Sequence, residues 1–175
     1  MGIFLITDAM GFGAMLTAYG VLRTRAPLWP DATQRLAIPL AAAMTLTLLT
    51  SSLTALFALA AARDGRIRAT RGWVAVTAGF GVAFLAGQAA EYHHLVNGAS
   101  GMGLTTDLFA STFYLVTGFH GLHVLAGVII WACVLAPGGQ RSHREGRIQV
   151  AALYWHFVDL AWAPIFTFLY LLPGR

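Results

Sequence analysis

Residues 108–136 read LFASTFYLVTGFHGLHVLAGVIIWACVLA and contain no aspartate, glutamate, lysine or arginine. An α-helix rises about 1.5 Å per residue, so about 20 consecutive apolar residues are needed to cross the hydrocarbon core of a bilayer. This stretch is longer than that, and its polar side chains are mainly hydroxyl groups and two histidines. It therefore predicts a transmembrane helix.

Four more stretches of this kind make up most of the remaining chain. They lie at about residues 3–22, 36–62, 73–95 and 150–172. Hydrophobic residues form 58% of the 175 residues and charged residues only 10%, which is outside the range of soluble globular proteins. We predict one all-α domain over residues 1–175, an integral membrane bundle of five transmembrane helices. The sequence lacks the strand-length alternation that a membrane barrel requires.

The first apolar stretch is expected to remain in the protein as a helix. No basic region precedes Ile3, and Asp8 interrupts the apolar run, a pattern that is not typical of a cleaved signal peptide. The single cysteine, Cys133, has no partner for a disulfide within the chain and cannot form a cysteine-based metal site.

The distribution of arginine predicts the orientation of the chain. All 11 basic residues are arginines in or near short connectors, so the sequence pI of about 9.8 reflects membrane topology rather than nucleic-acid binding. The second and fourth connectors share a side with the N-terminus and carry Arg63, Arg66, Arg68, Arg71, Arg141, Arg144 and Arg147. The opposite side carries only Arg23, Arg25, Arg35 and Arg175. The positive-inside rule then places the N-terminus inside and the C-terminus outside.

Three residues next to the predicted helices are candidates for the membrane–water interface. Arg23 and Trp29 lie in the stretch RTRAPLWP at residues 23–30, and Trp73 follows the basic turn at residues 63–71. Tryptophan is enriched where a helix leaves the hydrocarbon, and basic residues flank such helices. We therefore expect all three side chains to be interfacial.

Six ionisable side chains inside the predicted helices are the candidates for function. They are Asp8, Glu91, His120, His123, His156 and Asp159. A charged side chain at the bilayer centre costs at least about 2.5 kcal/mol, so each needs a partner or a purpose. Position along the helices predicts Asp8, His156 and Asp159 in the inner half, the two histidines of the fourth helix near the middle, and Glu91 toward the outer face.

Two pairs of these residues share a helical face. His120 and His123 are three residues apart, as are His156 and Asp159. A histidine–carboxylate pair can relay a proton, or the two groups can simply satisfy each other's hydrogen bonds, within one helix or across helices. The structural role is the default interpretation.

Two kinds of metal chemistry stay open from the residues alone. His120 and His156 could ligate a heme between two helices, as in a b-type cytochrome, although bulky residues surround His156. Glu91 and His94 have the Glu-x-x-His spacing of di-metal carboxylate sites, but the chain has no second copy of that motif.

Four motifs, in order and spacing, resemble subunit III of the heme-copper terminal oxidases, the cytochrome c and quinol oxidases. They are QAAEY at residues 88–92, DLFASTFY at 107–114, TGFHGLH at 117–123 and YWHFVD at 154–159. The last two are specific to the family. The stretches at residues 22–30 and 49–52 extend the resemblance toward the N-terminus.

The resemblance implies a non-redox accessory subunit in the bacterial inner membrane, in the short five-helix form, with its N-terminus inside. It implies packing on the catalytic subunit I beside other oxidase subunits, phospholipid binding in a cleft, and support of proton uptake and turnover stability during oxygen reduction. Heme and copper would belong to partner subunits, and this chain would hold no metal and no catalytic residue. Asp8 would support proton uptake, while the other five ionisable side chains would form buried networks that contact lipid or other subunits.

Three features differ from the family pattern. The seven-helix form has two additional N-terminal helices, and this chain resembles the family from the third helix onward; in some bacterial oxidases the additional pair is carried elsewhere in the complex. The acidic residue of the first helix, usually glutamate, is Asp8, which is one methylene shorter. Gln149 replaces a common glutamate, and Pro164 interrupts the usual bulky run and predicts a kink.

Two alternative functions remain from the sequence. An accessory subunit of a nitric oxide reductase would share these motifs, and a free-standing b-type cytochrome would use His120 and His156 as heme ligands. The motifs encode neither the identity of the lipid nor the choice between cytochrome c and quinol as electron donor.

Overall fold

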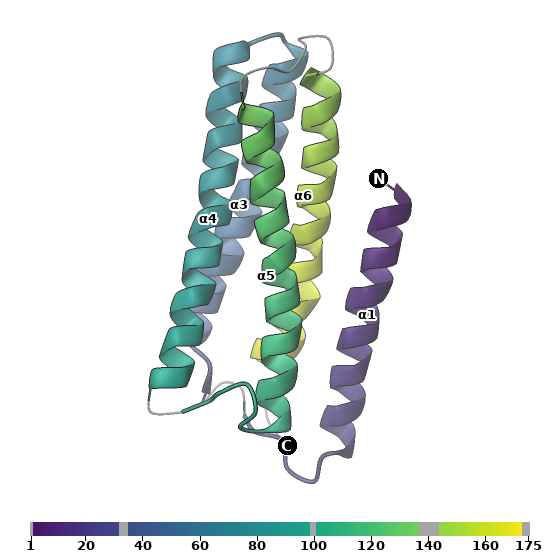
Figure 1. Cartoon of the computed structure of the whole chain (residues 1–175), viewed down its shortest axis with the longest axis vertical. Helices are drawn as coiled ribbons and strands as arrows, with labels where there is room; N and C mark the ends of the chain where they lie inside the picture. The colour runs from purple at the N-terminus through teal and green to yellow at the C-terminus, as the bar shows by residue number, and fades with distance from the viewer. Residues whose placement is uncertain (1, 32–34, 99–100, 137–143, 173–175) are drawn as a thin grey trace.

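The computed structural model describes residues 2–31, 35–98, 101–136 and 144–172, with the backbone alone at position 144. Within these ranges the chain is all-helical and has five long apolar helices (Figure 1). They are α1 (Gly2–Arg25), α3 (Ile38–Arg63), α4 (Ile67–Asn97), α5 (Leu108–Leu135) and α6 (Arg144–Phe166), which continues into the π-helical segment η2 (Thr167–Leu171). Each is long and apolar enough to cross a bilayer, which confirms the predicted all-α bundle of five apolar helices.

Two helices extend further than the apolar pattern indicates. α4 begins at Ile67 rather than at residue 73, and α6 begins at Arg144 rather than at residue 150. Their first turns carry arginines, whose aliphatic stems can lie along apolar surface while the guanidinium group reaches water. Hydropathy therefore marks only the apolar part of each helix. Arg141 and Arg175, which contribute to the predicted orientation, lie outside the described residues.

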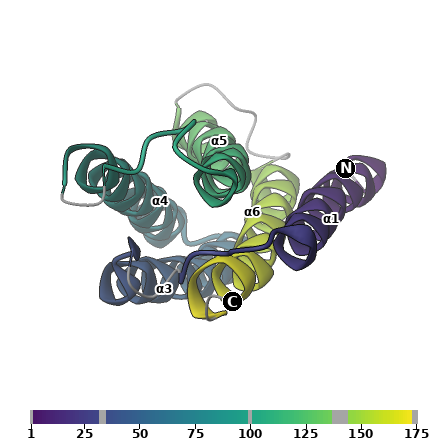
Figure 2. The ribbon, with the colours of Figure 1, turned by 90° about the horizontal axis from the view of Figure 1, so that it is seen from below.

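α1 stands at the side of a closely packed group formed by α3, α4, α5 and α6, and α6 lies between α1 and α3 (Figure 2). A tight turn joins α3 to α4, and its Gly65 has a φ of 69°, which glycine adopts without steric cost. This turn and the start of α6 lie at one end of the bundle, which we call the α3–α4 end (Figure 1). The end of α1, the start of α3, the end of α4 and the start of α5 lie at the other end, which we call the C-terminal end.

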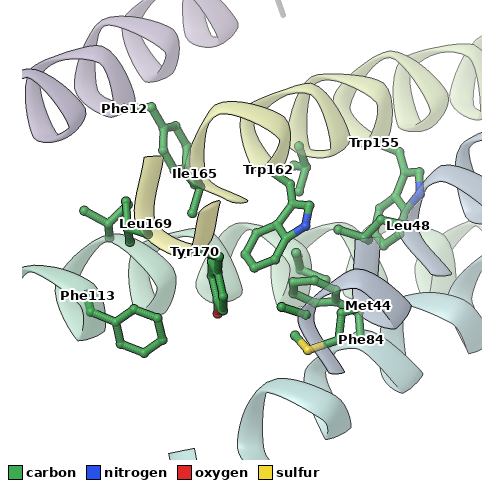
Figure 3. Close-up of a cluster of buried hydrophobic side chains, with 14 of the residues drawn as sticks. Phe12, Met44, Leu48, Phe84, Phe113, Trp155, Trp162, Ile165, Leu169 and Tyr170 are labelled. Atoms are coloured by element: carbon green, nitrogen blue, oxygen red, sulfur yellow. The ribbon is translucent and has the colours of Figure 1, made fainter. Parts of the chain in front are cut away.

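The last helix supplies Trp155 and Trp162, two of the three largest fully buried side chains, and α5 supplies the third, Trp131. The side chains that point from α6 and η2 into the interior include Trp155, Trp162, Ile165, Leu169 and Tyr170 (Figure 3). Trp162 packs edge-to-face on Phe84 of α4, with ring centroids 5.0 Å apart. Lipid tails are as apolar as leucine, so close packing of this kind is a main force that holds membrane helices together.

Trp155 lies in a slot between two glycines. A Cβ atom at Gly81 of α4 would lie 2.6 Å from both the indole and Val128, and one at Gly127 of α5 would lie 2.6 Å from the same indole. The indole Nε1 donates to Oγ of Ser51 in α3 at 2.9 Å. Trp155 therefore connects α3, α4 and α5 to α6, and the volume of its ring requires both glycines.

Pro164 lies inside α6 without ending it. Proline lacks an N–H donor, and its ring crowds the carbonyl group one turn earlier. The helix nevertheless continues to Phe166 and then passes into the π-helical segment η2. At this junction the Thr167 hydroxyl donates to the backbone oxygen of Ala163 at 2.9 Å. The sequence predicts a kink at Pro164, and the chain changes from α-helix to π-helix directly after this residue.

The connector between α1 and α3 is held against the start of α5. Trp29 is 4% exposed and lies edge-to-face with Tyr19 of α1 at 5.4 Å and with Phe109 of α5 at 5.9 Å. Arg35 forms an ion pair with Asp107. The other oxygen of Asp107 caps α5 by accepting a backbone N–H of the first turn at 2.7 Å.

We expect Gly81→Ala to destabilise the bundle by about 1–3 kcal/mol, because the added methyl group overpacks the slot that holds Trp155. Gly79→Ala on the same helix is the matched control, since a Cβ atom there would meet nothing within 4 Å. The measurement is the thermal midpoint of the detergent-solubilised protein. Equal midpoints for the two variants would show that the slot is not tight.

Candidate functional site

The first polar network joins α4 to α5. The Gln88 side-chain Nε2 donates to the backbone oxygen of Thr117 at 2.7 Å and to the Tyr92 hydroxyl at 3.0 Å. The Tyr92 hydroxyl also bonds the Thr117 hydroxyl at 2.7 Å. A Cβ atom at Gly121 would collide with the Gln88 amide, so glycine is needed opposite it. The QAAEY and TGFHGLH motifs therefore satisfy each other's polar groups.

Glu91 connects α4 to the end of the last helix. Its side chain is 1% exposed, and its Oε2 accepts a hydrogen bond from the Tyr170 hydroxyl at 2.7 Å. Tyr170 belongs to η2 and packs edge-to-face on Phe113 of α5 at 5.6 Å. The other carboxyl oxygen, Oε1, has no hydrogen-bond partner among the described residues. Glu91 is thus an enclosed acceptor that fixes η2 against α4.

Asp8 and His123 join α1 to α5 inside the bundle. Asp8 Oδ2 lies 3.0 Å from Nε2 of His123, and both side chains are mostly buried. The contact lacks the alignment of a hydrogen bond, so it is electrostatic. His123 Nδ1 lies 2.8 Å from the backbone oxygen of Phe119. Since a carbonyl oxygen only accepts, the proton of this hydrogen bond belongs to Nδ1, and the contact with Asp8 is an ion pair only when both ring nitrogens carry a proton.

Phe12 forms another contact of α1 with the bundle. Its ring is 4% exposed and meets the rings of Phe119 at 5.2 Å and His123 at 5.3 Å. At the other margin of α5, the Tyr154 hydroxyl of α6 donates to the backbone oxygen of His123 at 3.0 Å. The position of His123 is therefore fixed from α1 and from α6 together.

His120 is an aromatic member of the core. It is fully buried, and its ring lies 5.0 Å from Trp162 and 5.5 Å from Phe84. Neither ring nitrogen has a hydrogen-bond partner among the described residues. Packing against aromatic rings is therefore the interaction that holds His120.

His156 and Asp159 lie where α6 meets α3. His156 Nδ1 is hydrogen-bonded to the Ser52 hydroxyl, and its Nε2 is buried without a partner in the described chain. Asp159 is 8% exposed. The Ser52 hydroxyl lies close to the Asp159 carboxyl group. Neither carboxyl oxygen, however, has a partner with hydrogen-bond geometry among the described residues. This contact between α6 and α3 therefore holds three buried polar atoms without a hydrogen-bond partner in the described chain, namely Nε2 of His156 and both carboxyl oxygens of Asp159.

The pairs that share a helical face do not bond to each other in the described structure. His123 finds Asp8 on α1, and His156 finds Ser52 on α3. Both histidines therefore have their partner on another helix, and bonding across helices is one of the two arrangements that the sequence left open. The six candidates from the sequence do not include Ser52 and Tyr170, although residues 49–52 belong to the stretches that resemble the family.

The three predicted interfacial residues differ in their exposure. Arg23 lies in the last turn of α1, beside Tyr19. Trp29 is buried by protein, because the connector folds back onto the helix ends. Trp73 is 37% exposed and packs on Phe57 at 5.1 Å.

The described residues contain no group of three His, Cys, Asp or Glu side chains that could hold a metal ion. Glu91 is buried while His94 is exposed, so the Glu-x-x-His motif does not converge on one site. His120 packs among aromatic rings and His156 contacts Ser52, so the two imidazoles are not arranged as axial ligands of one heme. These residues do not fit a heme or a di-metal centre.

Five apolar helices whose seams carry buried polar contacts define a multi-pass α-helical membrane protein. A family model described as "Cytochrome c oxidase subunit III" matches residues 2–173. The chain therefore belongs to the heme-copper oxidase subunit III family, in a five-helix form, and is a subunit of a terminal oxidase complex of the respiratory chain.

Curated relatives agree with the family match over nearly the whole chain. "Cytochrome c oxidase subunit 3" of Synechocystis sp. is 39% identical over 175 residues, covering 97% of this chain and 73% of the relative. The protein of the same name in Thermostichus vulcanus is 36% identical, covering 97% and 84%. "Cytochrome bo(3) ubiquinol oxidase subunit 3" of Pseudomonas putida is also 36% identical, covering 97% and 83%. Similar subunits thus occur in oxidases named for either electron donor.

We expect Glu91→Leu to destabilise the protein by about 1–3 kcal/mol, because the buried Tyr170 hydroxyl loses its acceptor. Glu91→Gln keeps an acceptor oxygen at the same reach and is expected to lose less. The readout is the thermal midpoint, compared in a double-mutant cycle with Tyr170→Phe. Additive effects of Glu91→Leu and Tyr170→Phe would mean that the hydrogen bond contributes nothing.

Proposed function

We propose that this chain is a non-redox accessory subunit III, which packs on the catalytic subunit I, holds phospholipid and supports proton uptake and stability during turnover. The observation that carries this proposal is the family match over residues 2–173. The geometry supports it, because the ionisable side chains of the described helices meet protein groups or aromatic rings rather than a cofactor site. The names of the relatives, which are subunits of cytochrome c and ubiquinol oxidases, favour an oxygen-reducing complex over a nitric oxide reductase.

Asp8 is the residue that we assign to proton uptake support. It lies on α1, 3.0 Å from His123, and its side chain is 16% exposed at the side of the bundle. A carboxylate beside an imidazole can bind a proton and release it as the charge of its neighbour changes. This arrangement supports a local proton reservoir next to the catalytic subunit.

A groove at the α3–α4 end supports lipid binding. It has a volume of about 590 Å³, and its apolar lining from α5 and α6 includes Ile129, Ile130, Val134, Val150 and Ala151. Arg147 also lines the groove and donates to the backbone oxygen of Cys133 at 2.8 Å. An acyl chain fits the apolar walls, and a guanidinium group attracts a phosphate headgroup.

The proposed orientation has the N-terminus inside. The described arginines at the α3–α4 end, Arg63, Arg66, Arg68, Arg71 and Arg147, outnumber those at the C-terminal end, Arg23, Arg25 and Arg35. Short loops rich in arginine stay on the cytoplasmic side. The lipid groove would then face the inner leaflet.

Purification through a tag on this chain in mild detergent tests the assignment. Mass spectrometry is expected to find a large histidine-rich subunit I, and the chain separated from its partners is expected to show no heme absorption. Phospholipid should be retained by the complex and fall about five-fold in Arg147→Ala, the equivalent of about 1 kcal/mol. Arg66→Ala is the matched control, since Arg66 pairs locally with Asp64. Heme retained by the isolated chain would favour the cytochrome instead.

Asp8→Ala is expected to leave the complex assembled, because Phe12 and Trp29 still anchor α1. Its oxidase activity should decline several-fold faster over repeated turnovers, measured as oxygen consumption with subunit retention determined before and after. His123→Ala is the control that breaks the same ion pair but keeps the carboxylate. Equal inactivation rates for the two variants would indicate that the pair only anchors α1, and a wild-type rate for Asp8→Ala would reject the proton role.

A further inference from the structure

The acidic side chains of the described chain differ in what lies beside them. Those that lie against an arginine or a histidine are Asp8, Asp64, Asp107 and Glu145. Glu91 and Asp159 are buried and form no such pair among the described residues. Glu91 still accepts the Tyr170 hydroxyl, whereas neither oxygen of Asp159 has a hydrogen-bond partner there. Asp159 is therefore the acid whose charge would be least compensated in the described structure.

Two tryptophans enclose Asp159 between α6 and α3. Trp155 lies one turn before it and donates to the Ser51 hydroxyl at 2.9 Å. Trp162 lies one turn after it and donates to the Thr45 hydroxyl at 2.9 Å. Positions 155, 159 and 162 share one face of the helix, near the middle of the last apolar span. The carboxyl group therefore lies between two interhelical hydrogen bonds and far from both membrane surfaces.

The helices around Asp159 offer its carboxyl group no positive charge. α3 contains no ionisable side chain before Arg63, which is its last residue. On α6, Nδ1 of His156 is bonded to the Ser52 hydroxyl, and Nε2 has no partner in the described chain. On α5, neither ring nitrogen of His120 has a hydrogen-bond partner there. A carboxylate buried without a cation or a donor is strongly disfavoured, and such a group binds a proton instead.

The hydroxyl of Ser52 has only one hydrogen to donate. It is bonded to Nδ1 of His156 and lies close to the Asp159 carboxyl group. If Ser52 donates to Nδ1, it can meet Asp159 only as an acceptor, which requires a proton on the carboxyl group. The opposite direction would leave a buried carboxylate with a single donor and no cation. The hydrogen count therefore favours a protonated acid.

We propose that Asp159 is a proton-binding site inside the bundle, separate from Asp8, and that it is a carboxylic acid in the folded protein. Its O–H donates to the Ser52 hydroxyl, which donates to Nδ1 of His156, and the remaining ring proton is on Nε2. The last span then carries no charge after Arg147, which suits a helix that crosses hydrocarbon. This assignment does not depend on the partner subunits.

Infrared spectroscopy of the purified protein tests the protonation state. A carboxylic acid has a C=O stretching band that a carboxylate lacks. In a wild-type minus variant spectrum, the bands of other residues and of co-purified subunits cancel. At neutral pH we expect Asp159→Asn to lose one such band. The matched control, Glu145→Gln, should lose none, because Glu145 is exposed and pairs with Arg63. Equal spectra for wild type and Asp159→Asn in this region would overturn the proposal.

Isotopic labelling gives the same test without a substitution. Aspartate labelled at its side-chain carboxyl carbon is incorporated into the unaltered chain, and the acid band of this chain is expected to shift. A band that does not respond to the label would belong to Glu91 and would refute the assignment to Asp159. A band that shifts with the label but persists in Asp159→Asn would place the proton on another aspartate and would refute it as well.

Ser52→Ala tests the hydrogen bond from Asp159. A hydrogen bond from the O–H weakens the C=O bond of the acid, so loss of the Ser52 acceptor should shift the band to higher frequency. Thr50→Ala on the same helix is the control, since Thr50 is exposed and its hydroxyl bonds the Leu46 backbone oxygen. An unmoved band in Ser52→Ala would contradict the chain of hydrogen bonds to His156.

Discussion

The absence of water in the hydrocarbon core is the constraint on which the structure of this chain depends. A polar group there has to find its partner in the protein, and the motifs of the chain supply such partners in complementary sets. Gln88 and Tyr92 meet Thr117, Glu91 meets Tyr170, and Asp8 meets His123. Each set joins two different helices, so these hydrogen bonds and the Asp8–His123 contact also fix which helices are neighbours.

Close packing of aromatic side chains provides the other contacts that hold the helices together. The indole of Trp155 fills the space left by Gly81 and Gly127, and Trp162 lies against Phe84 and His120. A histidine therefore serves as an aromatic ring of the core at position 120 and as the partner of a carboxyl group at position 123. The difference arises from the direction of each side chain, since His120 faces the bundle centre and His123 faces α1.

Most of the fold could be predicted from the sequence, because about 20 apolar residues without charge have few alternatives to a membrane helix. The family could be predicted as well, since motifs such as YWHFVD combine rare residues at fixed spacing. The partners of the polar residues could not be. Helical spacing shows that His156 and Asp159 share a face, yet Ser52, 104 positions from His156, is the actual contact. Such a contact depends on helix order and rotation, which hydropathy does not contain.

The ion pair between Arg35 and Asp107 has a consequence for the order in which the protein is made. The two residues are 72 positions apart, and α3 and α4 separate them in the chain. Arg35 therefore leaves the ribosome long before its counter-charge exists, and the connector that carries it cannot be fastened until α5 is synthesised. This contact between the segment after α1 and the start of α5 can therefore form only after α3 and α4 have been synthesised.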